Sequence, residues 1–204
     1  MDYDADRLCY RSSTLPTVKR PPWMAVTLVL VCIIFYLLGA EEWGTYKRDL
    51  AEQNWRFVFA SFSHYNLIHL VSNISVLFVL GSMLEIKSHT AWLLLLTLVV
   101  TSTTIVFLHL CLPAYVIFAG ISCLNFALLG YFLGEECEHH LNLCVAITLL
   151  LVAYEVYVVM FIAESLSDST KPVWQLHLIA FLEGVGLHLI QRRLIRTRLR
   201  GINT

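Results

Sequence analysis

The chain has 204 residues, of which 58% are apolar and only 14% are charged, and its mean hydropathy is +0.70. This composition is too apolar for a soluble globular domain, and it predicts an integral, multi-pass membrane protein. The formal net charge of −1 is too small to indicate a nucleic-acid partner.

Six apolar segments are long enough to cross a bilayer, since a helix needs about 20 residues to span the hydrocarbon. They lie near residues 22–40, 67–86, 91–112, 114–134, 142–163 and 174–190. We therefore expect an all-α, polytopic bundle of six transmembrane helices over residues 22–190. Residues 1–21 would form a short N-terminal segment, and residues 191–204 would form a basic tail.

Basic residues flank the first and the last predicted span, and an even number of spans leaves both termini on one side. The positive-inside rule predicts that this side is cytoplasmic. The first apolar run is as long as a span and lacks a cleavage pattern, so we expect it to stay as a signal anchor. The flanking residues are Arg7, Arg11, Lys19 and Arg20, then Arg192, Arg193, Arg196, Arg198 and Arg200.

Neither a metal nor a cofactor is expected. The six cysteines show no CxxC spacing, so they imply neither a disulfide framework nor a zinc site. The adjacent residues His139 and His140 project from different faces of a helix, which favours a solvated turn over a pair of metal ligands.

The longest polar stretch between spans, residues 41–66, mixes aromatic and polar side chains. Trp55 and Arg56 lie side by side within it, and aromatic residues beside a basic one are typical of a segment in the membrane interface. We expect a folded outer loop that is embedded in the membrane.

The second span carries His69 and Asn73 four residues apart, which places both side chains on one helix face. Polar groups are costly in hydrocarbon unless they face a cavity or a partner. They are therefore either interhelical hydrogen-bonding groups or part of a functional site.

A small-residue stretch with Gly120 and Ser122 follows Pro113, which breaks the third helix. A loop that dips into the membrane, with a helix beginning at Ser122, fits this stretch better than a full helix from residue 114. A serine at a helix start faces unpaired backbone N–H groups, a favourable place for negative charge. The alternative is that Ser122 only packs, because small residues also line close helix contacts.

The last span begins with His177 and carries Ala180 and Gly184, a small-xxx-small pair that allows close approach of a neighbouring helix. Spans 2, 4 and 6 run in the same direction, so His69, Ser122 and His177 are expected at one depth in the outer half of the bilayer. A serine becomes nucleophilic when a histidine takes its proton, and attack on a carbonyl needs donors for the oxyanion. His69, Asn73 and the Ser122 N–H are candidates for these donors.

The whole pattern resembles the rhomboid family of intramembrane serine proteases over about residues 22–190. The matching residues are Trp55, Arg56, His64, His69, Asn73, Gly81, Glu85, Gly120, Ser122, His177, Ala180 and Gly184.

The resemblance implies that Ser122 is the nucleophile and His177 the general base and acid. It implies that His69, Asn73 and Gly120 stabilise the oxyanion, and that Trp55 and Arg56 shape the embedded loop. His64, Ala180 and Gly184 would support the site.

Three positions depart from the family's usual pattern. The family has Gly where this chain has Cys123, which would add bulk at a tight helix contact, and Gly where it has Ala180. Phe126 stands where a Tyr often stacks on the catalytic histidine, so ring packing is kept while a hydroxyl is lost. No acidic third member is apparent, as expected for a Ser–His dyad.

The sequence from His64 to Leu70 also resembles rhombosortases, the rhomboid branch that processes C-terminal Gly-Gly membrane anchors of exported bacterial proteins. This resemblance implies a bacterial inner membrane and membrane-anchored protein substrates. The oligomeric state is left open.

Two alternatives remain. One is a rhomboid-like protein that binds membrane helices without cutting them, although such members typically lose the serine or the histidine. The other is a small transporter that uses Glu155 and Glu183 as a proton path, but no internal repeat supports it.

Overall fold

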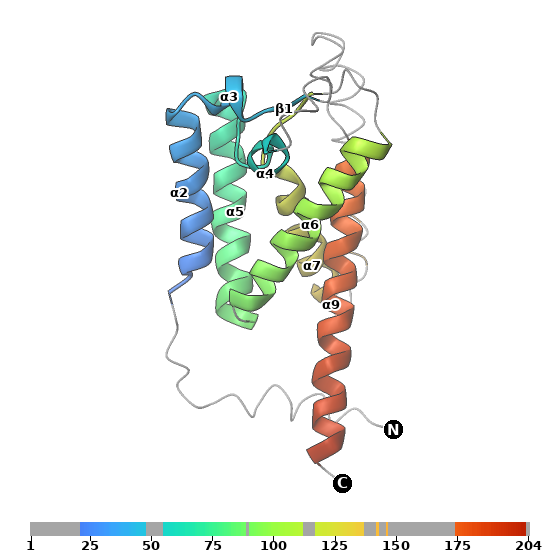
Figure 1. Cartoon of the computed structure of the whole chain (residues 1–204). Helices are drawn as coiled ribbons and strands as arrows, with labels where there is room; N and C mark the ends of the chain where they lie inside the picture. Colours follow the sequence, from blue (N-terminus) through green and yellow to red (C-terminus); the bar gives the residue numbers. More distant parts are fainter. Residues whose placement is uncertain are drawn as a thin grey trace.

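The computed structural model describes residues 21–47, 55–88, 90–111, 117–136 and 174–202, together with positions 142 and 146. Within these ranges five long helices form the bundle in Figure 1. They are α2 (Trp23–Leu37), α5 (Leu67–Ser88), α6 (Thr90–Leu110), α7 (Ser122–Glu136) and α9 (Trp174–Ile202). Two short helices, α3 (Ala40–Trp43) and α4 (Arg56–Ala60), lie between α2 and α5.

The described helices agree with five of the six predicted spans, with changed ends. Helices α2, α5 and α6 begin and end within three residues of the first three spans. The fourth span is shortened to α7, which begins at Ser122 as the dipping-loop interpretation predicts. Most of the fifth, residues 142–163, lies outside the described residues. The sixth is extended, because α9 continues through the basic tail to Ile202.

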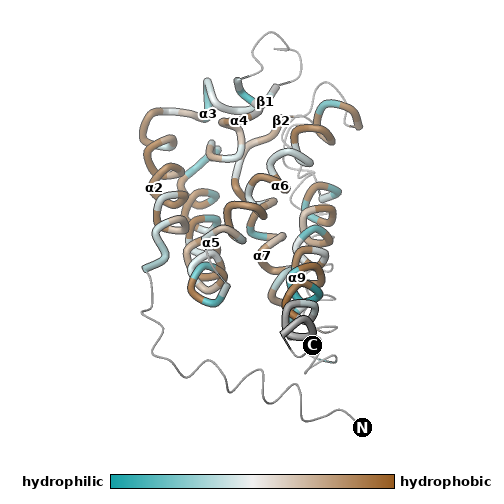
Figure 2. Tube along the Cα trace, turned by 60° about the horizontal axis from the view of Figure 1, so that its bottom comes forward, coloured by the Kyte–Doolittle hydropathy of each residue, from teal (hydrophilic) through white to brown (hydrophobic). Residues whose placement is uncertain are grey.

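Apolar residues make up most of α2 and α6, as the brown colour of these helices in Figure 2 shows. In the described part of the chain, α5 and α6 are long and apolar enough to cross a membrane, and α2 is a shorter apolar helix. Large apolar side chains such as Ile68, Leu98 and Leu182 are more than half exposed. A surface of this kind suits a lipid environment.

Helices α7 and α9 pack against each other more extensively than any other described pair. A Cβ on Gly184 would overlap the carbonyl oxygen of Ala127, and one on Gly130 would overlap that of Phe181. Ala180 on the same face is 1% exposed. The predicted close approach at Ala180 and Gly184 is therefore confirmed, and backbone contact between the helices sets their spacing.

A two-stranded sheet was not predicted. Strand β1 (Tyr46–Lys47) pairs antiparallel with β2 (Ile117–Phe118), so that Tyr46 lies opposite Phe118. The backbone N–H of Gly120 donates to the carbonyl oxygen of Ala60 at 2.9 Å. The connection between α2 and α5 therefore holds the segment before Ser122 in two places, through the β1–β2 pairing and through the Gly120–Ala60 hydrogen bond.

At the other end of the bundle, Glu85 joins three helices. Its carboxylate accepts the backbone N–H groups of Met24 and Ala25, both at 3.1 Å, and the Thr90 hydroxyl at 2.7 Å. These N–H groups belong to the first turn of α2, where no intrahelical acceptor exists. Glu85 thus caps α2 from the end of α5.

Candidate active site

Ser122 and His177 meet where α7 and α9 begin. Ser122 is the first residue of α7, and His177 lies in the first turn of α9. The Ser122 Oγ lies 3.0 Å from the His177 Nε2, within hydrogen-bond reach. When Nε2 carries no proton, the serine hydroxyl donates to it, which is the arrangement that activates a serine as a nucleophile.

The His177 ring is held by an aromatic neighbour on α7. Phe126 stacks on it with ring centroids 4.3 Å apart and an angle of 11° between the planes. Residues 122 and 126 are one turn apart, so the same face of α7 presents the hydroxyl and the stacking ring. The stack restricts how the imidazole can turn relative to Ser122.

Gly120 brings His69 and Asn73 close to the nucleophile. It has φ +114°, a conformation that residues with a side chain rarely adopt. A Cβ at this position would lie 2.8 Å from His69 Cε1 and 3.6 Å from Asn73 Nδ2. The two donors predicted from the sequence therefore face the backbone two residues before Ser122.

The contribution of Gly120 is space for its neighbours. Its own N–H is already bonded to the Ala60 carbonyl, so this N–H is not available to an oxyanion. By contrast, the first N–H groups of α7, including that of Ser122, have no carbonyl partner within the helix.

Rings from the loop before α5 surround His69. Tyr65 stacks on it at 5.6 Å and 11°, and the His64 ring meets it at 5.0 Å and 60°. His64 is fully buried, and its Nδ1 lies 3.1 Å from the Phe62 carbonyl oxygen. Burial lowers the pKa of His64 to about 4, so this ring is neutral near pH 7.

Trp55 and Arg56 fold the loop that precedes α5. The buried Arg56 donates from Nη1 to the carbonyl oxygens of Glu42 and Thr45, at 3.3 and 3.1 Å. Its guanidinium lies 5.0 Å from the centre of the Trp55 ring, close enough for a cation–π contact. The expectation of a folded loop is thus confirmed at these two residues.

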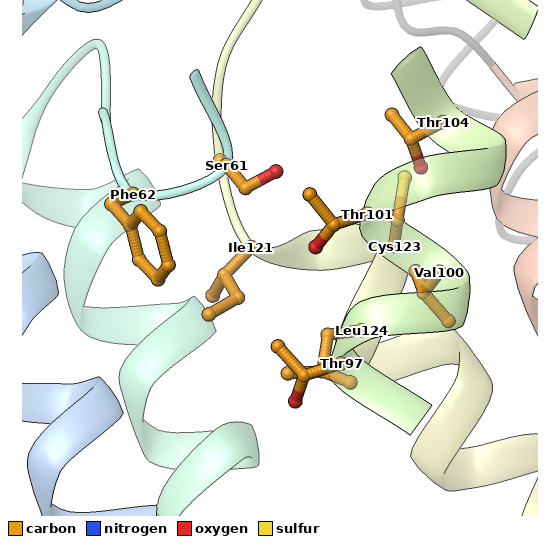
Figure 3. Close-up of a pocket in the computed structure, with 10 residues that line it drawn as sticks. Ser61, Phe62, Thr97, Val100, Thr101, Thr104, Ile121, Cys123 and Leu124 are labelled. Carbon is orange, nitrogen blue, oxygen red and sulfur yellow. The ribbon is translucent and has the colours of Figure 1, made fainter. Parts of the chain in front are cut away.

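The Cys123 side chain lies on the side of α7 that faces α6. It lines a small cavity between α6, α7 and the loop after α4, with Thr97, Thr101 and Thr104 on the α6 side (Figure 3). The contact between α7 and α9 is made by Ala127 and Gly184 instead. The Cys123 thiol does not separate Ser122 from His177 in the structure.

Asn125 is a site residue that the sequence reasoning missed. Its Nδ2 donates to the backbone oxygen and the Oδ1 of Asn73, both at 3.0 Å. A polar side chain inside an apolar helix, three residues after the candidate nucleophile, was the available signal.

Other polar residues singled out in the sequence do not join this constellation. Glu155, His139 and His140 lie outside the described residues. One carboxylate oxygen of Glu183 is buried without a hydrogen-bond partner among the described residues. In that same part of the chain no three His, Cys, Asp or Glu residues cluster as a metal site would require.

Comparison with known proteins gives a consistent result. A family model described as the Rhomboid domain matches residues 51–194. A protein of Haemophilus influenzae named Rhomboid protease GlpG is 31% identical over 130 residues, which are 57% of this chain and 66% of that protein.

Two further proteins named Rhomboid protease GlpG come from Yersinia species. That of Yersinia enterocolitica is 29% identical over 53% of this chain and 41% of its own length. That of Yersinia pseudotuberculosis is 27% identical over 57% of this chain and 45% of its own length. The chain therefore spans less than two thirds of each of these relatives. Because the Rhomboid model covers more than half of the chain, the protein belongs to the rhomboid family, whose domain is a polytopic helical bundle of the membrane.

Proposed function

We propose that this protein is an intramembrane serine endopeptidase with a Ser122–His177 dyad. The observation that carries the proposal is the separation of 3.0 Å between Ser122 Oγ and His177 Nε2, on two helices that pack in backbone contact. The names of the relatives, Rhomboid protease GlpG, support the same activity.

The dyad accounts for both halves of the reaction. His177 Nε2 takes the hydroxyl proton while Ser122 Oγ attacks the peptide carbonyl carbon, giving a tetrahedral oxyanion. The same imidazole then gives its proton to the leaving nitrogen as the C–N bond breaks. A water molecule then attacks the acyl-serine while His177 takes a proton from it. The serine oxygen leaves with that proton, which gives the carboxylate product and the free serine.

The oxyanion would be stabilised by donors that already surround the backbone before Ser122. Asn73 Nδ2 and the His69 ring lie against Gly120, and the Ser122 N–H is at the start of α7. Fixed donors of this kind need no rearrangement when charge develops, and removal of one such donor typically costs about 10²–10³-fold in rate.

The proposed substrates are proteins anchored in the membrane, because the dyad belongs to an integral membrane bundle. We place the membrane domain at residues 22–190 and both termini in the cytoplasm, with residues 1–21 and 191–204 as flanking segments. The bacterial sources of the relatives support location in a bacterial inner membrane.

A finer proposal is that the substrates carry C-terminal Gly-Gly anchors, as in rhombosortases. The local pattern that suggests this branch begins the second span, where the Asn66 side chain accepts the His69 N–H at 2.8 Å. A matched pair of reporter proteins, with Gly-Gly or Val-Val before the same transmembrane anchor, tests it. Equal cleavage of both reporters would contradict specificity for Gly-Gly anchors and would support a rhomboid protease of general specificity.

The first experiment is labelling of the detergent-solubilised chain by a fluorescent fluorophosphonate. Labelling should occur in the wild type and disappear in both Ser122→Ala and His177→Ala. Absence of labelling in folded wild-type protein would favour the alternative, a rhomboid-like protein that binds membrane helices without cutting them. Labelling that persists in Ser122→Ala would place the reactive hydroxyl elsewhere.

A further inference from the structure

Asn125 lies in the first turn of α7, three residues after Ser122, and is 6% exposed. Its side-chain NH₂ group makes two hydrogen bonds to a single residue of α5. One goes to the backbone oxygen of Asn73 and the other to the Asn73 Oδ1, each at 3.0 Å. Both N–H hydrogens of the Asn125 amide are therefore used on Asn73.

These bonds fix the direction of the Asn73 amide. Because its Oδ1 accepts from Asn125, its Nδ2 is turned away from Asn125, and Nδ2 lies 3.6 Å from the place where a Cβ on Gly120 would stand. An amide can turn by half a rotation and exchange its two ends. In that flipped state an oxygen would face the site, and it would repel a developing oxyanion.

We propose that Asn125 is a positioning residue, which holds the Asn73 side chain with its Nδ2 toward the reacting carbonyl. This inference rests on the proposed protease function and extends it to a residue that does not itself touch the substrate. The backbone bond to Asn73 adds a second constraint, because it keeps α5 and α7 in register beside Ser122.

A purely structural role for Asn125 makes a different prediction. If its two bonds only join α5 to α7, their loss would lower stability and would slow the reaction by the same factor whatever residue stands at position 73. If Asn125 acts through Asn73, its loss should matter only while Asn73 is present. A double-mutant cycle separates these cases.

The cycle compares wild type, Asn125→Val, Asn73→Val and the double variant of the full chain in detergent. The measured quantity is the second-order rate constant for fluorophosphonate labelling of Ser122, since the phosphonyl oxygen takes the position of the oxyanion. Asn125→Val should lower this constant about tenfold or more in the wild type, in line with a lost or misdirected oxyanion donor. In the Asn73→Val background it should lower the constant less than about twofold.

Thermal unfolding of each variant is measured alongside, and Gln191→Leu serves as a matched control. Gln191 is also buried and accepts an interhelical bond from the Tyr131 hydroxyl, but it lies far along α9 from His177. Its loss should lower the unfolding temperature and leave the labelling constant unchanged. If Asn125→Val does not fold, Asn125→Ala enters the same cycle with the same expectation.

An equal loss of rate in both backgrounds, or no loss in the wild type, would overturn the positioning role while leaving the protease proposal in place. A wild type without Ser122-dependent labelling would overturn the protease proposal, and this inference with it.

Discussion

The Phe126 ring has a defined effect on the dyad, because it stacks on His177 at 4.3 Å. Removal of the ring in Phe126→Ala frees the imidazole to turn away from Ser122, so fewer molecules hold the reactive geometry. We expect the fluorophosphonate labelling constant to fall about tenfold, since small misplacements of a catalytic group can cost about 10²-fold.

Phe126→Tyr is the matched control, because it keeps the ring and adds only a hydroxyl. Its labelling constant should remain within about threefold of the wild type. Equal constants in Phe126→Ala and the wild type would mean that backbone packing alone orients His177.

Gly120 is the residue at which a single methyl group should abolish the proposed activity. In Gly120→Ala the new Cβ would stand 2.8 Å from His69 Cε1 in a backbone conformation with φ +114°. The strain costs on the order of 1–3 kcal/mol, and relief requires movement of His69 or of the segment before Ser122. We expect loss of labelling by more than about 100-fold, with α-helical circular dichroism retained.

Gly39→Ala provides the comparison for this effect. Gly39 also has a positive φ, but in the described part of the chain no atom lies within 4 Å of its missing Cβ. The Gly39→Ala variant should be less stable than the wild type, without a comparable loss of labelling rate. A labelled Gly120→Ala protein with wild-type rate would show that the segment can move without harm to the site.

At the level of single residues, the sequence was informative where a polar side chain interrupts an apolar run. His69, Asn73, Ser122 and His177 stood out on that ground, and the structure brings them together. Asn125 was missed because its partner is on another helix, and no spacing rule connects the two positions. The sequence predicts added bulk at Cys123 but does not say which helix its side chain faces, since the identity of the neighbouring helix is not written in the local sequence.

Helices α7 and α9 are held by backbone contact, which predicts a sharp contrast between two glycines of α9. In Gly184→Ala the Cβ would overlap the Ala127 carbonyl, so α9 must move away from α7 and carry His177 with it. We expect a loss of about 2 kcal/mol or more in stability, as for other overpacked contacts, and a large loss of labelling. Detergent-based thermal unfolding and fluorophosphonate labelling measure the two effects.

Gly186→Ala is the same substitution two residues later on the same helix. Nothing lies within 4 Å of its missing Cβ among the described residues, so the added methyl group finds open space. Alanine favours a helix by about 0.5–1 kcal/mol over glycine, and the variant should be at least as stable as the wild type. Similar losses in both variants would argue against a contact specific to Gly184.

The element-level predictions succeeded for the helices and failed for the strands. A helix beginning at Ser122 follows from Pro113, which ends the third apolar run, and from Gly120, which comes two residues before Ser122. The pairing of Tyr46–Lys47 with Ile117–Phe118 could not be predicted, because strands of two residues show no alternation and lie about 70 residues apart. This pairing depends on the tertiary approach of two loops.

For the whole molecule, α7 and α9 run in the same direction, because Ser122 meets His177 at one end and Gly134 meets His188 further along. The chain therefore leaves α7 at one end of the bundle and enters α9 at the other. The predicted fifth span, residues 142–163, would make that crossing, although most of it lies outside the described residues. Alternation of spans across the membrane remains a prediction from the sequence.

The capping of α2 by Glu85 predicts that stability and catalysis can be separated. Glu85 is 12 residues beyond Asn73 on α5, roughly 18 Å along the helix, so its loss should not disturb the dyad. In Glu85→Leu the N–H groups of Met24 and Ala25 and the hydroxyl of the exposed Thr90 lose their acceptor, and a buried group left unsatisfied, such as the Ala25 N–H, costs about 1–3 kcal/mol. The unfolding temperature should therefore fall strongly, while the labelling constant, measured well below the unfolding temperature, stays within about twofold of the wild type.

Thr90→Val removes only one of the three bonds and should lower the unfolding temperature less. If Glu85→Leu instead slowed labelling without a change in unfolding temperature, the two ends of the bundle would be coupled, and Glu85 would act on the site and not on the assembly of α2, α5 and α6.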